Sequence, residues 1–252
     1  MPVEPPGHGL TYTARDMSAA LVSIVVPVHN EAAHIGALIP AMVTEVVAAV
    51  GPQELLIVEN GSTDATNEEA ERICEGLAGE GWKARVLSLP APDYGMALRH
   101  GFAEASGDWI VNFDVDYFSG AFVADAISQD GDIVIASKRA PGSTEQRSWF
   151  RRSATAVFNY ILRYLLSSQV SDTHGIKAFR RPIVDRFLAA TRSNQDLFDT
   201  ELILRAERSG AVIVELPVVV EEHRAARSLL KRVLRTLRGI LKLRRLFAEE
   251  SR

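Results

Sequence analysis

Two aspartates, Asp114 and Asp116, stand one residue apart at the end of the apolar run 109–113. Such a run, free of Gly and Pro, predicts a buried strand. In open α/β sheets, ligands bind beyond the carboxyl ends of the strands. Paired carboxylates there suit a hard divalent cation, Mg²⁺ or Mn²⁺, which also takes phosphate oxygens as ligands. The pair therefore predicts a metal that bridges the protein and a diphosphate. The plainer alternative is a strand followed by an acidic turn.

The elements that must position this pair alternate between strands and helices. We expect strands at residues 20–28, 54–59, 83–89, 109–113, 131–136 and 211–220, and helices at residues 31–50, 64–79, 94–105 and 195–208. The strict alternation in the first 116 residues specifies a parallel sheet with right-handed crossovers. No G-x-G-x-x-G follows the first strand and no G-x-x-x-x-G-K-[ST] is present, which disfavours dinucleotide oxidoreductases and P-loop enzymes.

Polar residues also follow the first two strands, in the segments 29–31 and 60–64. We expect Asn30 to cap the helix that comes next, and Asp64 or Thr63 to cap the helix after the second strand. Capping and turn chemistry would account for these side chains without any ligand.

Three segments in this order resemble the donor-site motifs of family 2 glycosyltransferases: VPVHNE at 26–31, ENGSTDAT at 59–66 and FDVD at 113–116. The resemblance implies the GT-A fold, a Rossmann-like α/β domain whose mostly parallel central sheet is flanked by helices. It also implies a nucleotide-sugar donor, a UDP- or GDP-hexose, and a metal at the Asp-x-Asp. The donor-binding residues that it implies are Pro27, His29, Asn30, Glu31, Glu59, Asn60, Ser62, Asp64, Asp114, Val115 and Asp116.

The chemistry of these residues suits a nucleotide base. Glu31 and Asp64 are acceptors for the N–H groups of a uracil or guanine ring, against which Pro27 and His29 could pack. The family usually has two aspartates where this chain has Glu59-Asn60, although an Asn carbonyl also accepts from a base N–H. This departure leaves the preferred base open.

A basic region follows the metal motif. The segments 137–143 and 171–181, with an Arg pair between them, resemble the dolichol- and polyprenyl-phosphate sugar synthases of the family, and the likeness extends over residues 22–223. In an otherwise acidic domain, basic side chains can neutralise a lipid monophosphate. The predicted acceptor-phosphate residues are Lys138, Arg139, Arg151 and Arg152. The alternative is a solvated basic loop.

Two further carboxylates, Asp199 and Glu201, open the helix at 195–208. In related enzymes a carboxylate here faces the acceptor, so both join Asp116 as catalytic candidates. Asp199 could instead be the cap of its helix.

Charge divides the chain into an acidic body and a basic tail. Residues 1–223 carry a net charge of −12, and residues 224–252 carry +8. This distribution does not suit a nucleic-acid-binding protein. Apolar and basic residues at 224–247 fall on opposite faces of a helix, which predicts contact with an anionic membrane surface. Packing of that helix on the domain or on a partner is the alternative.

Other features bound the location of the protein. Residues 1–19 are predicted to be a disordered leader and not a secretory signal. No segment reads as long and apolar enough to span a membrane. The single cysteine, Cys74, suits a reducing compartment. The expected architecture is therefore a leader at 1–19, a domain at 20–223 and a tail helix at 224–252, located in the cytoplasm at the inner face of the membrane. A homodimer stays open.

The predicted function is an inverting glycosyltransferase that moves a hexose, of glucose or mannose type, to a polyprenyl or dolichyl phosphate. A second hypothesis keeps the donor but uses a hydroxyl acceptor, for which Asp199 would serve as general base. A third is a catalytically silent, membrane-associated scaffold, which Glu59-Asn60 and Phe118 keep open and the intact Asp-x-Asp argues against.

Overall fold

The computed structural model describes residues 20–137, 144–145, 168, 170, 175–194, 197–217, 219–220 and 229–250. For residues 144–145, 219–220 and 229–238 it describes the secondary structure alone. The predicted leader and the predicted boundary at residue 223 lie outside the described residues.

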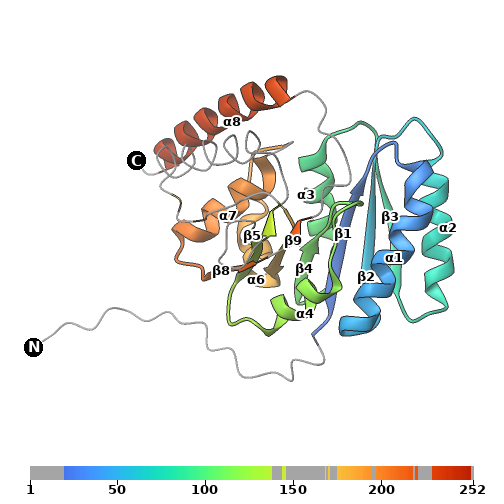
Figure 1. Ribbon diagram of the computed structural model, residues 1–252. Coiled ribbons are helices and arrows are strands. Elements are labelled where there is room, and N and C mark those ends of the chain that lie inside the picture. Colours follow the sequence, from blue (N-terminus) through green and yellow to red (C-terminus); the bar gives the residue numbers. More distant parts are fainter. Residues whose placement is uncertain are drawn as a thin grey trace, which may run out of the picture.

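The described strands form one large sheet and one small one (Figure 1). The large sheet has the order β3-β2-β1-β4-β7-β5-β8. Its strands are β1 (Val22–Val28), β2 (Glu54–Asn60), β3 (Lys83–Leu89), β4 (Trp109–Asn112), β5 (Ile133–Ser137), β7 (Lys177–Arg180) and β8 (Ile213–Pro217). The small sheet pairs β6 (Thr144–Glu145) with β9 (Val219–Val220). All neighbours in the large sheet are parallel except β7, which runs antiparallel to both β4 and β5.

Helices cover both faces of the large sheet. The described helices are α1 (Ala32–Val50), α2 (Thr66–Ala78), α3 (Tyr94–Glu104), α4 (Gly120–Ser128), α6 (Arg181–Phe187), α7 (Phe198–Arg208) and α8 (Leu229–Glu250). One core cluster joins α1, α2 and α4 to the sheet, and a second joins α3, α6 and α7 to its other face. In β1 the neighbours Ile24 and Val25 belong to different clusters, because successive side chains of a strand point to opposite faces. Burial on both faces explains the nearly unbroken apolar run of this strand.

The predicted α/β fold with a mostly parallel sheet is confirmed, and the first four strands and three helices occur in the predicted order. Two predictions about strands need correction. The strand predicted at 211–220 is two elements, since β8 ends at Pro217 and β9 belongs to the small sheet. The antiparallel strand β7 is not among the predicted strands, since its residues lie in the motif segment 171–181. Pro217 does lie in an edge strand, as its missing N–H requires.

Helix α1 corrects the expectation about membrane spans. It is long and apolar enough, by length and composition, to cross a membrane. Its buried residues, Ile35, Ile39, Met42, Val43 and Val46, belong to the core cluster that it forms with the sheet. A core helix of a globular domain has the same composition, so this helix is weak evidence for a membrane span.

The C-terminal half of the tail helix α8 packs against α7, and Figure 1 shows α8 on the same side of the molecule as α7. Ile240, Leu243 and Phe247 pack against Leu197 and Leu204 in a third apolar cluster. A Cβ on Gly239 would lie 2.2 Å from a methyl carbon of Leu197, so glycine permits this close approach. For residues 239–250 the structure therefore supports the alternative reading of the tail, a helix packed on the domain.

Candidate functional site

The segments that follow β1 and β2 meet at one edge of the sheet, because these strands are parallel neighbours. Asn30 lies in the left-handed region at φ 54°, and its Oδ1 accepts a hydrogen bond from the Thr63 N–H at 2.8 Å. The Asn30 N–H donates to Ser62 Oγ at 2.9 Å. His29 Nδ1 lies 2.9 Å from the carbonyl oxygen of Asn60. These contacts hold the two loops together as one surface.

The prediction that Asn30 caps α1 is wrong, because its side chain binds the neighbouring loop and the capping position is Glu31, which makes no capping bond through its side chain. The prediction that Asp64 or Thr63 caps α2 also needs correction, because the capping position is Ala65, which makes no capping bond through its side chain. Asp64 instead accepts hydrogen bonds from the first backbone N–H groups of both helices. Its Oδ2 accepts from Ala32 N at 3.3 Å at the start of α1, and its Oδ1 accepts from Thr66 N at 3.1 Å at the start of α2. The Thr66 hydroxyl, which also donates to Asp64, is the largest cause that lowers the pKa of this carboxyl.

Glu59 and Asn60 are the last two residues of β2, and their buried side chains bond the loops that follow. Glu59 accepts from the backbone N–H of Ser62, and Asn60 Oδ1 accepts from Asp93 N at 2.8 Å. In the loop after β2, Gly61 has φ 63°, and a Cβ there would come within 2.8 Å of the backbone of Ala91 in the loop after β3. The Asn60 amide oxygen, which could receive a base N–H, thus already accepts one hydrogen bond within the protein.

The other predicted donor residues differ in exposure. His29, Asn30 and Asp64 are exposed, and Glu31 and Ser62 are partly buried. Pro27 and Val115 are buried, the latter in the core cluster of α1, α2 and α4. A ligand could reach Val115 only through its backbone.

Asp114 and Asp116 lie in the turn that follows β4. The Tyr117 N–H donates to the Asp114 carbonyl oxygen at 3.1 Å, which closes the turn. Tyr94, the first residue of α3, donates its hydroxyl to Asp114 Oδ1 at 3.1 Å. The start of α3 is placed by Asp93, whose carboxylate accepts from Met96 N. The side chain of Asp114 is therefore oriented before any ligand arrives.

The electrostatic environment of Asp114 suits a cation. Burial raises the pKa of its carboxyl above the ordinary value, and the charges of Asp116 and Asp199 raise it further. The hydroxyl of Tyr94 and the charge of Lys177 oppose this rise. A divalent cation would relieve the crowding of negative charge, so the donor set fits Mg²⁺ or Mn²⁺. Among the described residues no group of three or more His, Cys, Asp or Glu could hold a metal, but such ions commonly keep waters and substrate phosphates as ligands.

A buried ion pair adjoins the two aspartates. Lys177, which is 1% exposed, places its Nζ 2.6 Å from Asp199 Oδ2 and donates to the Gly175 carbonyl at 2.7 Å. Asp199 Oδ1 accepts from Thr200 N at 2.8 Å. Both oxygens of Asp199 are thus engaged. Lys177 opens β7 in register with Asn112 of β4, two residues before Asp114.

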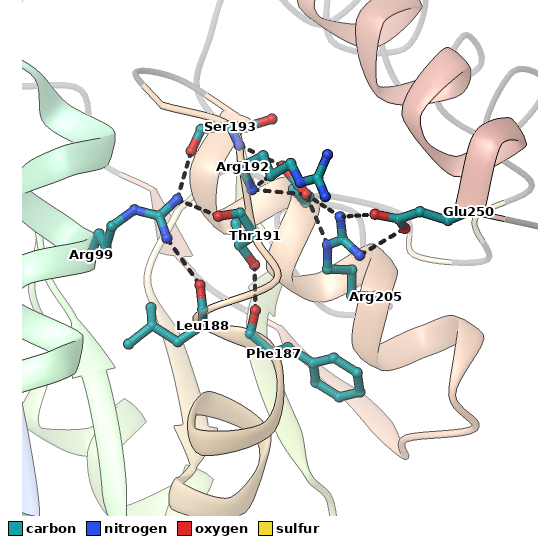
Figure 2. A network of polar contacts seen from close by, with 9 residues as sticks. Arg99, Phe187, Leu188, Thr191, Arg192, Ser193, Arg205 and Glu250 are labelled. Atoms are coloured by element: carbon teal, nitrogen blue, oxygen red, sulfur yellow. Dashed lines mark hydrogen bonds and ion pairs between the residues drawn. The ribbon is translucent and has the colours of Figure 1, made fainter.

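Glu201 has a different environment from Asp199, although both lie in the first turn of α7. Its side chain is fully buried and accepts from the backbone N–H groups of Arg192 and Ser193 and from the guanidinium of Arg205. Arg205 also binds Glu250 of α8 (Figure 2). The carboxylate that was predicted beside the acceptor thus joins α7, the preceding loop and α8.

Arg99 of α3 holds the same loop from the other side. Its guanidinium donates to the carbonyl oxygens of Leu188, Thr191 and Ser193, as Figure 2 shows. Sequence reasoning missed Tyr94, Arg99 and Lys177. Lys177 stood in a segment that was singled out, whereas a lone Tyr and Arg on a helix carry no local signal. The predicted acceptor residues Lys138, Arg139, Arg151 and Arg152 lie outside the described residues.

Comparison with known proteins adds the family. The family model described as glycosyl transferase family 2 matches residues 23–188. Glycosyltransferase AglD of Haloferax volcanii is 30% identical over 208 residues, which are 78% of this chain and 32% of AglD. An undecaprenyl-phosphate 4-deoxy-4-formamido-L-arabinose transferase of Aeromonas hydrophila is 32% identical over 180 residues, 67% of this chain and 51% of that protein. The chain thus spans about half or less of these two relatives.

In two other comparisons the aligned region covers more of the compared protein. A polyprenol monophosphomannose synthase of Mycolicibacterium smegmatis is 26% identical over 213 residues, 79% of this chain and 77% of that protein. A crystal structure of glucosyl-3-phosphoglycerate synthase from Mycobacterium tuberculosis, in complex with Mn²⁺, UDP-glucose and phosphoglyceric acid, aligns with a TM-score of 0.64. It is 22% identical, and the alignment covers 95% of this chain and 84% of that one. This last likeness concerns the fold.

Proposed function

We propose that this chain, which belongs to glycosyl transferase family 2, moves a hexose from a UDP- or GDP-sugar to a polyprenyl phosphate with inversion at the anomeric carbon. The observation that carries the proposal is the placement of Asp114 and Asp116 at the end of β4, beside the joined loops that follow β1 and β2. The names of two relatives, an undecaprenyl-phosphate sugar transferase and a polyprenol monophosphomannose synthase, support the lipid acceptor.

In this proposal the residues around the site have different roles. Asp114 and Asp116 would hold Mg²⁺ or Mn²⁺, and the bound ion would supply positive charge to neutralise the diphosphate leaving group. Tyr94 keeps one oxygen of Asp114 in a fixed direction. The exposed side chains of His29, Asn30 and Asp64, with the partly buried Glu31, offer the surface on which the base would bind.

The acceptor chemistry favours a phosphate over a hydroxyl. A phosphate monoester is already ionised near pH 7, so its oxygen can attack the anomeric carbon without a general base. A hydroxyl acceptor needs a general base, and Asp199 is the predicted candidate for that role. Both of its oxygens already accept hydrogen bonds, from Lys177 and from Thr200 N, so a hydroxyl would have to compete with a buried ammonium group. This arrangement supports the phosphate acceptor.

The acceptor phosphate would lie between Lys138, Arg139, Arg151 and Arg152. Arg139→Ala and Arg152→Ala are therefore expected to raise KM for the lipid about tenfold, the effect of one lost charge-assisted contact, while KM for the nucleotide sugar changes little. A change confined to KM of the donor would contradict the assignment.

We place the chain at the membrane surface, on the cytoplasmic side as a reducing compartment would suit its single cysteine, and the exposed face of α8 supports contact with that surface. Leu241, Lys242, Arg244 and Arg245 are exposed, while the neighbouring Ile240 and Leu243 are buried on the domain. Contact with an anionic bilayer would then be electrostatic, at about 1 kcal/mol for each basic residue near the surface. Flotation with anionic liposomes at increasing salt tests this contact, since binding that persists at high salt would contradict an electrostatic origin.

The deciding experiment measures transfer of labelled hexose from a panel of UDP- and GDP-sugars to undecaprenyl phosphate, with Mg²⁺ or Mn²⁺ present. We expect a solvent-extractable product from one donor and none after addition of EDTA. Metal-dependent hydrolysis of the donor without a lipid product would redirect the proposal to another acceptor. If a folded protein gives neither the lipid product nor donor hydrolysis, the proposal is overturned in favour of the scaffold hypothesis.

A further inference from the structure

We propose that Lys177 is a positioning residue of the cation site, and that the pair Lys177–Asp199 holds the charge beside Asp114 near zero. The inference rests on the proposed metal at Asp114 and Asp116. It assigns a role to a buried lysine that lies outside the donor motifs, and it predicts that the two members of the pair change cation affinity in opposite directions.

The placement of Lys177 follows from the sheet. Lys177 opens the antiparallel strand β7, where it is the register partner of Asn112. Directly opposed residues of antiparallel strands place their side chains on the same face, about 5 Å apart at Cβ. Ile110 and Phe179, two residues away in each strand, belong to the core cluster of α3 and α7. Lys177 and Asn112 therefore lie on the face of the sheet from which Tyr94 and Asp199 reach the site.

The pair is rigid. The Lys177 ammonium is 1% exposed and has two acceptors, Asp199 Oδ2 and the Gly175 carbonyl. The second oxygen of Asp199 is held by the backbone of α7. Gly175 lies at φ 108°, a backbone conformation that residues with a side chain rarely adopt. This turn directs the Gly175 carbonyl toward the Lys177 ammonium. Neither charge can move away from the other without leaving a buried group unpaired.

A fold does not need such a pair for its stability. Apolar residues of similar volume often replace buried ion pairs with no loss, whereas removal of one partner is costly. The location of this pair beside Asp114 gives it a use. The charges of Lys177 and Asp199 both act on the Asp114 carboxyl, in opposite senses. Asn112 Oδ1 is a buried acceptor that no described residue satisfies, so this wall of the site is polar beyond the ion pair.

The signs of the expected effects follow from Coulomb's law. Removal of the ammonium by Lys177→Met leaves an extra negative charge near the cation and should tighten its binding. Asp199→Asn leaves an extra positive charge and should weaken it. At the distances within one site, a change of one charge amounts to about tenfold in affinity for a divalent cation. The double variant Lys177→Met with Asp199→Asn restores neutrality and should return to within about threefold of the starting value.

The experiment titrates the full chain with Mn²⁺ alone and follows free Mn²⁺ by electron paramagnetic resonance at low ionic strength. Lys83→Met and Asp130→Asn are matched controls, because both residues are exposed and lie at the amino ends of strands, away from the site. Lys83 is the first residue of β3, and Asp130 shortly precedes β5. They should leave the affinity unchanged. Opposite shifts for Lys177→Met and Asp199→Asn support the proposal, since general damage to the structure would weaken both.

Weaker Mn²⁺ binding by both single variants, or no change in either, would overturn the inference. Asp199→Asn could fail to fold because it leaves a buried lysine without its partner. In that case the effect of Asp199→Asn on Mn²⁺ affinity is measured in the double variant, which must bind Mn²⁺ more weakly than Lys177→Met alone. Equal or tighter binding by the double variant would refute the proposed role. The proposed function fails separately, if Asp114→Ala and Asp116→Ala retain the Mn²⁺ affinity of the parent chain.

Discussion

The two sides of the site are built from different interactions. On the donor side, the loops after β1 and β2 are joined by hydrogen bonds between side chains and backbone, such as Asn30 to Thr63 and Asn60 to Asp93. On the other side, around β7, α7 and α8, charged pairs hold the elements, as in Lys177–Asp199 and Glu201–Arg205. A neutral hydrogen bond contributes about 1 kcal/mol, whereas breaking a buried charge pair costs about 3–5 kcal/mol.

This difference separates the roles of the two sides. On the donor side, the side chains that hold the loops, such as Asn30 and Asp64, are also exposed, so a ligand could reach them. The side of α7 has its charges committed to one another, so single substitutions there should damage the fold as well as the reaction. The predictions below test this separation.

The largest effect is expected at the junction of the two sides. Asp116→Ala removes a carboxylate from the proposed metal site and should lower sugar transfer at least about a thousandfold, because charge on the leaving diphosphate is no longer neutralised. Transfer assays on the purified chain measure this, with thermal unfolding as the control for folding. Unchanged turnover would remove Asp116 from the mechanism.

The next effect tests the charged side through stability. Glu201→Gln leaves Arg205 without its buried partner and should lower the free energy of unfolding by about 3–5 kcal/mol. Glu250→Gln changes the other partner of Arg205. The Glu250 side chain is 37% exposed, so this change should cost less than about 1 kcal/mol. Chemical denaturation measures both. Equal losses of unfolding free energy in the two variants would show that burial does not make the Glu201 contact stronger than the Glu250 contact.

A smaller effect tests the attachment of α8. Ile240→Ala removes a fully buried side chain from the contact with α7 and should cost about 2–4 kcal/mol. Leu241→Ala, at a side chain that is 50% exposed, should stay within about 0.5 kcal/mol. Urea unfolding and the rate of proteolysis within α8 report the difference. A reversed order would mean that the opposite face of the helix is the docked one.

The smallest effect lies on the donor side and depends on pH. The pKa of Asp64 is lowered in the folded chain, so its hydrogen bonds stabilise the fold above the ordinary carboxyl pKa. This contribution disappears as the pH falls through the lowered pKa. Asp64→Asn should therefore make unfolding less dependent on pH between about 5 and 3. A pH profile of thermal unfolding identical to that of the parent chain would contradict the assignment.

Much of the donor side could be predicted from the residues in order. The alternation of apolar runs and helical segments has a local cause, since a strand buried on both faces must be apolar throughout. The position of the Asp-x-Asp after β4 followed from the same pattern. The contact of Asn30 with the neighbouring loop could not be predicted, because its side chain could bond either its own helix or the loop after β2. The proximity of Thr63 decided that choice.

The side of α7 depends on contacts between residues far apart in the sequence. Lys177 and Asp199 are 22 residues apart, and Arg205 and Glu250 are 45 apart. No local pattern distinguishes Asp199, which pairs with Lys177, from Glu201 two residues later, which holds a loop. The amphipathic pattern of α8 showed that one face would be buried but not what would cover it. Periodicity reports which side chains leave water, and only the folded chain decides which surface receives them.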